Sequence, residues 1–322
     1  MTQLEFEKQF DTQEKCLAYI ESIRYQGGRY SCHKCGCTKV WVIERKKHKE
    51  AKKQQKPVIP VYECAQCGYH GSVISGTIFQ DTHKSLVLWF RAIWHIVSQK
   101  NGTSALNIQR QLGIGSYKTA WLWLHKLRRA MVVPGRDKLS GVVEVDEALF
   151  GGAKKGKRGR GADSKVLAAI AVEINDNKVG RIRIQIISAA TKENLNEFVL
   201  KNVEKGSTVV TDGWGGYNDL ESKGYIHEVS LASKDNASES LPHVHTVVSL
   251  IKRWIIGTLQ GSCSAEHMAY YFDEFTFRFN RRTSKSRGKL FYRMVQNAVC
   301  TNPTIYSVIV QNDEVMQNTC VK

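Results

Sequence analysis

The spacing of apolar residues changes near residue 141. Before it, apolar positions recur every three or four residues, which predicts helices in residues 1–25 and 86–131. After it, short apolar runs predict strands at 142–150, 166–174, 181–187 and 208–211, with helices at 192–203, 244–260 and 264–281. A segment with strands first and helices later predicts an α/β or α+β domain.

Charge and length narrow the classes of protein. The 322 residues are enough for two or three domains. The chain carries 47 Lys and Arg against 30 Asp and Glu, a net charge of +17, which favours a polyanionic partner over a merely basic surface. The N-terminus does not resemble a signal peptide, and the apolar stretch 86–97 is interrupted by Arg91 and His95. We therefore expect a cytoplasmic protein, in which cysteines bind metal or stay free.

Two cysteine pairs predict a structural zinc site. Cys32 and Cys35 form one C-x-x-C pair, and Cys64 and Cys67 form the second, 28 residues further on. Two such pairs supply four thiolates to one tetrahedral zinc ion, which leaves no open position for chemistry. Cys37 is a spare whose spacing fits the same site less well. A redox-active motif, the alternative, would need one pair.

Residues 104–121 have the pattern of a helix-turn-helix. A helix from Ser104 is followed by a turn with Gly113 and Gly115, and Ser116 precedes a second helix. In such a unit the second helix enters the major groove of DNA with its N-terminal residues. An ordinary helical hairpin is the alternative. The candidate DNA contacts are Tyr117, Lys118 and Trp121, with Arg128 and Arg129 nearer the phosphates.

A glycine-spaced basic run, residues 152–165, separates the first two predicted strands. This composition cannot form a core, so we expect an exposed loop that either contacts the DNA backbone or is simply solvated. The candidate contacts are Lys154, Lys155, Lys157, Arg158 and Arg160.

Acidic residues mark a candidate catalytic site. In the run VVEVDEALF, alternation puts Glu144 and Asp146 on one face and Glu147 on the other. Asp212 ends the predicted strand at 208–211. Carboxylates on neighbouring strands bind Mg²⁺ through oxygen and leave positions for water and a phosphate. Alternatively, Asp146 is a strand-edge charge and Asp212 a turn former.

A third feature lies on the predicted helix that begins at Pro242. His245 and Lys252 are seven residues apart, which is two helical turns, so their side chains share one face. A metal ligand followed by a cation that holds DNA phosphate is a meaningful arrangement beside two carboxylates.

Together these motifs resemble bacterial insertion-sequence transposases that join a zinc ribbon to a DDE-type catalytic domain, the ISXO2-like family. The resemblance covers nearly the whole chain, through SGTIFQDTHKSLVLWFRAIW, QRQLGIGSYKTAWLWLHKLRRAM, VEVDEALFGG, VVTDGWGGY and YFDEFTFRFNRR. It implies a multidomain protein with a zinc ribbon and N-terminal helix (1–80), a helix-turn-helix domain (81–135), an α/β ribonuclease-H-like catalytic domain (141–300) and a tail (301–322). It also implies Mg²⁺ dependence and cutting and strand transfer at element ends.

The resemblance also implies roles for single residues. Asp146 and Asp212 match the first two family aspartates, and Lys252 matches the basic residue after the third acid. His245 then stands where Glu is usual, and Leu250, where some relatives carry Asn, cannot ligate. Either His245 or Glu239 supplies the third ligand, or this copy is catalytically weak. Imidazole suits Mn²⁺ better than Mg²⁺.

Three classes of function follow. The first is an active transposase that acts on double-stranded DNA at the element ends and target, as a homodimer or larger assembly. The second is a transposase-derived DNA-binding protein that no longer cleaves. The third is a zinc-ribbon transcription regulator, which predicts that Asp146 and Asp212 do not converge.

Overall fold

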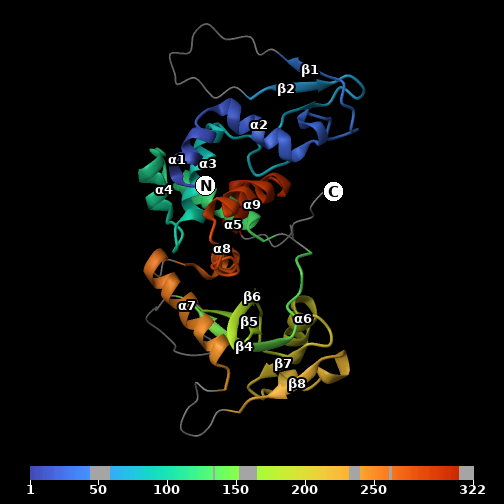
Figure 1. Ribbon diagram of the computed structural model, residues 1–322, viewed down its shortest axis with the longest axis vertical. Coiled ribbons are helices and arrows are strands. Elements are labelled where there is room, and N and C mark those ends of the chain that lie inside the picture. Colours follow the sequence, from blue (N-terminus) through green and yellow to red (C-terminus); the bar gives the residue numbers. More distant parts are fainter. Residues whose placement is uncertain (44–58, 133–134, 152–164, 232–239, 261–262, 312–322) are drawn as a thin grey trace. The chain divides into compact units, whose positions relative to one another are not determined.

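The computed structural model describes residues 1–43, 59–132, 135–151, 165–231, 240–260 and 263–311 (Figure 1). The chain divides into two compact units, one of residues 1–134 with 284–322 and one of residues 135–283. Within the described ranges, no helix is both long and apolar enough to cross a membrane.

The first unit is mainly helical, with a small three-stranded antiparallel sheet in the order β1-β2-β3. Its first four α-helices begin at capping residues, because the Thr2, Thr12, Ser85 and Ser104 hydroxyls accept hydrogen bonds from backbone N–H groups of the first turn. Its elements are α1 (Gln3–Gln9), α2 (Gln13–Arg24), η1 (Gln26–Gly28), β1 (Val40–Ile43), β2 (Val61–Cys64), β3 (His70–Gly71), α3 (Leu86–Ser98), α4 (Ala105–Leu112), α5 (Tyr117–Ala130), α9 (Arg287–Cys300) and α10 (Tyr306–Gln311).

An aromatic core joins α9 to the N-terminal helices. The Phe291 ring is fully buried, with its centroid 5.1 Å from that of Phe6, 5.2 Å from Phe10 and 5.6 Å from Phe90. This packing explains why α9 belongs to the first unit, so that the second unit ends at 283, whereas we expected a domain reaching residue 300. The four predicted functional domains remain predictions.

The second unit is built on a mixed five-stranded sheet in the order β6-β5-β4-β7-β8. Strands β4, β5 and β6 pair antiparallel, whereas β7 runs parallel to both β4 and β8. The elements are β4 (Val142–Phe150), β5 (Val166–Asn175), β6 (Lys178–Ile186), α6 (Lys192–Asn202), β7 (Thr208–Thr211), η2 (Gly215–Tyr217), η3 (Glu221–Lys223), β8 (Ile226–Val229), α7 (Pro242–Leu259), η5 (Ala265–His267) and α8 (Met268–Phe279).

Both faces of this sheet are covered. Ile170 and Val172 of β5 pack in one core with α7 and α8, whereas Ala169 and Ala171 pack in a second core with α6 (Figure 1). A strand buried on both faces has a continuous apolar run rather than alternation, and β5 reads VLAAIAV. The sheet therefore holds β4, which carries Asp146, between two helical layers.

Candidate active site and metal centres

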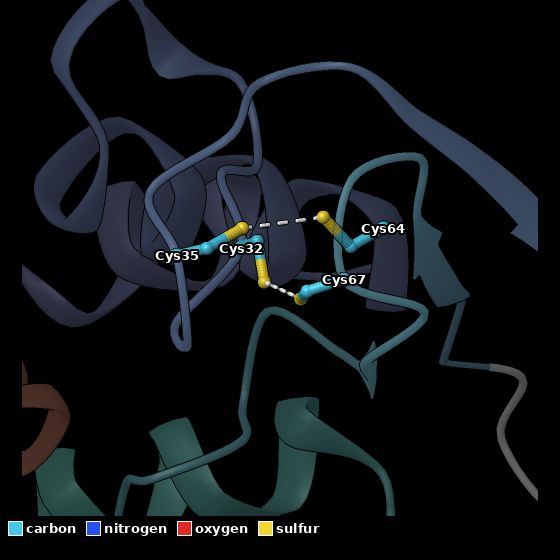
Figure 2. Close-up of side chains that lie close together, drawn as sticks. All are labelled: Cys32, Cys35, Cys64 and Cys67. Carbon is cyan, nitrogen blue, oxygen red and sulfur yellow. Dashed lines mark hydrogen bonds between the residues drawn. The ribbon is translucent and has the colours of Figure 1, made fainter.

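The four predicted zinc ligands converge. The thiols of Cys32, Cys35, Cys64 and Cys67 all lie within 4.8 Å of one another. The first two come from the loop before β1, and the other two from the end of β2 and the turn after it (Figure 2). The Sγ atoms are 3.6 Å apart in the pair Cys32–Cys67 and 3.5 Å apart in the pair Cys35–Cys64.

These distances fit a tetrahedral zinc ion, for which Zn–S bonds of about 2.3 Å imply S–S separations of about 3.8 Å. Backbone N–H groups of Cys67 and Gln66 lower the pKa of Cys64 to about 6, and the thiolate is the form that binds metal. Cys37 stays outside the cluster, and its Sγ lies 3.7 Å from the Lys39 carbonyl oxygen. The four cysteines could thus hold zinc.

Helices α4 and α5 follow each other through a connection of four residues, 113–116. Gly113 ends α4 in the left-handed conformation, with φ of 63°, which glycine adopts without a steric cost. At the start of α5, Tyr117 is 52% exposed, and the Lys118 Nζ lies 3.8 Å from the centre of the Tyr306 ring. Trp121 packs on His125, with ring centroids 3.9 Å apart.

Two arginines of α5 were predicted to lie near phosphates, and one of them is buried. Arg128 is only 2% exposed and its Nη1 lies 3.5 Å from His125 Nδ1, so it belongs to the interior of the first unit. Its position corrects the predicted phosphate contact, because Arg128 continues the buried stripe of Ala120 and Leu124 at four-residue spacing. Arg129 donates a hydrogen bond to the Thr304 hydroxyl.

The two candidate catalytic aspartates follow the paired segments of neighbouring strands, Asp146 within β4 and Asp212 directly after β7. In the parallel pair, Glu144 of β4 lies opposite Val210 of β7, an offset of 66 residues. Continued by two residues beyond this last pair of the ladder, the same offset would bring Asp146 opposite Asp212, the first residue after β7. Strands in a sheet are about 4.8 Å apart, so both carboxyl groups start from adjacent backbone positions.

Helix α7 lies against the same face of the sheet as Asp146. The Nε2 atom of His245 lies 3.6 Å from Asp146 Oδ2, and its side chain is 39% exposed. Two turns along, Lys252 Nζ lies 5.9 Å from the centre of the Phe150 ring, at the end of β4. Both α7 residues thus approach the strand that carries Asp146, as their seven-residue spacing predicts. Leu250 packs against the apolar core.

The remaining acids of β4 separate as predicted by alternation. Glu144 accepts hydrogen bonds from α7, through His243 Nδ1 at 2.6 Å and the Val244 backbone N–H at 2.8 Å. Glu147 faces the opposite side, where its Oε2 accepts a hydrogen bond from the Tyr217 hydroxyl at 3.1 Å. Asp146 is therefore the acid of this strand that faces His245.

Sequence reasoning missed the residues that support the site. Burial raises the pKa of Tyr217 well above its ordinary value, and the nearby carboxylates of Glu147 and, less strongly, Asp146 add to this shift. The Tyr217 hydroxyl therefore keeps its proton and remains a hydrogen-bond donor. The Trp214 backbone N–H donates to Asp212 Oδ1 at 3.0 Å. The motif TDGWGGY carried a signal for both residues, since an Asp before a glycine turn commonly accepts from the backbone two residues on.

His243 is a further residue that the pattern did not reveal. Its Nδ1 donates to Glu144, and its Nε2 lies 3.3 Å from the Asn177 carbonyl oxygen. Burial lowers the pKa of His243, but the hydrogen bonds to Glu144 and Asn177 outweigh burial and raise it overall. A buried glutamate in a strand, two positions before Asp146, was the available signal.

The aspartates and His245 are not yet at coordination distance. Among the described residues, the four cysteines form a group of His, Cys, Asp or Glu side chains whose donor atoms all lie within 4.8 Å of one another. Asp146, Asp212 and His245 do not form such a group. Asp212 is exposed, and the side chain of His245 is 39% exposed. A bound cation offsets the repulsion that keeps carboxylates apart.

Some candidate residues lie outside the described ranges. These are Glu239, the alternative third ligand, and the basic loop residues Lys154, Lys155, Lys157, Arg158 and Arg160.

The chain is similar to proteins of transposable elements. Residues 138–280 match the model of the ISXO2-like transposase domain. An uncharacterized protein in the transposable element ISH50 of Halobacterium salinarum is 24% identical over 299 residues, which are 88% of this chain and 95% of that protein. The crystal structure of the Mos1 strand transfer complex matches 65% of this chain and 74% of its own at 12% identity, with a TM-score of 0.27.

Proposed function

Because the chain belongs to the ISXO2-like insertion-sequence transposases, we propose that it binds the terminal inverted repeats of its element and carries out metal-dependent DNA cleavage and strand transfer. The observation that supports this function most is the parallel pairing of β4 with β7, whose last pair, Glu144 and Val210, lies two residues before Asp146 and Asp212. We assign the second unit to the ribonuclease-H-like class, since three antiparallel strands are followed by two parallel ones with helices on both faces.

The reaction is a pair of in-line displacements at phosphorus. Asp146 and Asp212 would hold Mg²⁺ or Mn²⁺, which would supply charge neutralisation on the phosphate and activation of the attacking water. The Trp214 N–H keeps the Asp212 carboxylate oriented, and Lys252 binds a DNA phosphate as a point charge. Water attacks the phosphorus at the element end and breaks its bond to the 3′-oxygen, which leaves as the 3′-hydroxyl of the element. That hydroxyl then attacks a phosphorus of the target strand and displaces a target 3′-oxygen, with no covalent protein intermediate.

His245 is the proposed third ligand. Its 3.6 Å distance from Asp146 supports this role, because a small rotation brings both groups to one cation. A neutral imidazole suits Mn²⁺ better than Mg²⁺, so Mn²⁺ should support cleavage at lower concentration. Glu239 remains the alternative ligand.

DNA recognition is assigned to the first unit and the basic loop. The exposed Tyr117, with Lys118 and Trp121, leads the second helix of the helix-turn-helix into the major groove. The zinc ribbon supports folding, and the 152–165 loop adds backbone contacts. A dimer or larger assembly holds two element ends together.

Cleavage of a labelled duplex tests this function. The duplex carries one terminal inverted repeat, found as matching sequence on the two flanks of the gene, and the full chain is loaded with zinc. We expect a strand cut at the element end that requires Mg²⁺ or Mn²⁺ and leaves a 3′-hydroxyl. Retained binding of the repeat with no cut under either cation would instead show a DNA-binding protein that has lost catalysis.

His245→Glu identifies the third ligand. Since it restores the acid usual in the family, cleavage with Mg²⁺ should be kept or increased. His245→Ala should raise the Mn²⁺ concentration needed for cleavage. If Glu239→Ala has that effect and His245→Ala does not, the loop residue is the ligand.

A further inference from the structure

Helix α7 begins without a cap of its own. The N-cap residue Leu241 makes no side-chain hydrogen bond, and Pro242 at the first helical position has no N–H group. Glu144 fills this role from β4, since one carboxylate oxygen accepts from the Val244 N–H at 2.8 Å and the other from His243 Nδ1 at 2.6 Å. Glu144 is 4% exposed, and a negative group at a helix N-terminus is stabilising.

His243 ties this helix end to a second part of the sheet. Its Nε2 lies 3.3 Å from the carbonyl oxygen of Asn177, in the turn between β5 and β6. That turn is tight, because Asp176 and Asn177 both have positive φ, 48° and 56°. One attachment to strand β4 and one to the β5–β6 turn hold the first turn of α7 and limit its rotation about the helix axis.

The rotation of α7 determines where His245 lies. Val244 points into the core and is fully buried, and His243 and His245 are displaced from it by about 100° in opposite directions. The first turn of α7 therefore contacts β4 at two positions, where His243 bonds to Glu144 and His245 lies beside Asp146. At a side-chain radius of about 5–6 Å, a 20° rotation moves the His245 ring by about 2 Å, whereas functional groups need placing to about 0.5 Å.

We propose that Glu144 and His243 form a clamp, a pair of positioning residues that fixes the first turn of α7 on β4 and so sets His245 against Asp146. The inference rests on the proposed role of His245 and Asp146 as metal ligands. The clamp residues bond to each other, to the Val244 N–H and to the Asn177 carbonyl oxygen, and so act through the helix.

Four variants of the full, zinc-loaded chain test the clamp. Glu144→Ala removes both acceptors, and His243→Ala removes the bridge. His243→Asn keeps a donor close to the position of Nδ1. Glu173→Gln is the matched control, since Glu173 is also a buried glutamate of this sheet, on β5, but its carboxylate accepts hydrogen bonds from Arg181 and the Ser140 backbone N–H.

Two measurements separate positioning from general stability. The first is Mn²⁺ binding, titrated by the loss of the free-ion paramagnetic resonance signal, with Asp146→Asn defining the part due to this site. The second is amide hydrogen exchange at residues 243–247. We expect Glu144→Ala and His243→Ala to weaken Mn²⁺ binding about 10-fold or more and to accelerate exchange there. His243→Asn should recover most of the binding, and Glu173→Gln should change neither.

The outcomes distinguish the two proposals. Unchanged Mn²⁺ affinity or unchanged exchange in Glu144→Ala overturns the clamp and leaves the proposed function standing. An equal loss of affinity in Glu173→Gln also overturns it, because the effect is then general destabilisation. If the wild-type chain shows no Asp146-dependent Mn²⁺ binding, the proposed function fails and the clamp fails with it.

Discussion

Replacing Tyr217 with Phe tests the hydrogen bond between Tyr217 and Glu147, which lies on the face of β4 opposite Asp146. The Tyr217 side chain is fully buried, and its hydroxyl donates to Glu147 Oε2 at 3.1 Å. Phenylalanine keeps the ring and its packing in the second core but removes the donor. The substitution therefore isolates one hydrogen bond to a carboxylate.

The expected cost follows from the type of acceptor. Hydrogen bonds to charged groups contribute about 1.5–3 kcal/mol, and because Glu147 is half-exposed, water partly replaces the lost donor. We expect about 2 kcal/mol, which for a unit of residues 135–283 lowers Tm by about 4–8 °C. Tyr225→Phe is the control, since its hydroxyl donates at the same 3.1 Å to the neutral Val203 carbonyl. That bond is worth about 1 kcal/mol, or about 2–4 °C.

Thermal unfolding of the two variants, followed by calorimetry of the full chain, measures the difference. Tyr217→Phe should lose about twice as much stability as Tyr225→Phe. Equal losses, or a larger loss in Tyr225→Phe, would refute the reasoning that the Glu147 carboxylate strengthens the buried hydrogen bond.

Three further predictions concern zinc, salt and pH. Cys64→Ala should lose the bound zinc and unfold the ribbon while the second unit stays folded, whereas Cys37→Ala should keep the zinc. Metal analysis with calorimetry checks both variants, and zinc retained by Cys64→Ala would contradict the ligand set. Replacing the five basic candidates of the 152–165 loop with Ala should flatten the salt dependence of DNA affinity by a log–log slope of about 4, and an unchanged slope would mean a solvated loop. Burial raises the pKa of Glu173, but hydrogen bonds from Arg181 and a backbone N–H lower it overall, below the ordinary 4.5. The Glu173–Arg181 pair therefore stabilises the fold above about pH 4.5, and this contribution is lost as the pH falls through the lowered pKa of Glu173. Glu173→Gln should lower the free energy of unfolding by about 2 kcal/mol at pH 7 and remove this part of the pH dependence. A pH profile of stability that is the same in Glu173→Gln and the wild type would contradict the prediction.

The sequence predicted the strands that carry strong apolar patterns. Strand β4 was expected at 142–150 and is found there, because its alternation is regular, and β5 was recognisable from its continuous apolar run. Strand β8 was missed, since it lies at the sheet edge with Ile226 and Val229 more than half exposed, so no face of it is buried enough to leave a pattern.

The site was predictable where chemistry is local in sequence. The C-x-x-C spacing predicted the cysteine cluster, and seven-residue spacing put His245 and Lys252 on one helix face. The long-range partners were not predictable, because Glu144 and His243 are 99 residues apart and meet only through the packing of α7 on β4. Arg128 was misplaced because a basic residue suggested a surface, although four-residue spacing from Leu124 indicated the buried side of α5.

The central claim is that Asp146 and Asp212 together hold the catalytic cation. The most direct test compares Asp146→Asn and Asp212→Asn with the wild-type chain in cleavage of the element-end duplex, with binding of the same duplex measured in parallel. Asparagine removes the negative charge with little change in size. The account predicts that each variant binds the duplex like the wild type yet produces no cut strand with Mg²⁺ or Mn²⁺. Wild-type cleavage by either variant would contradict it.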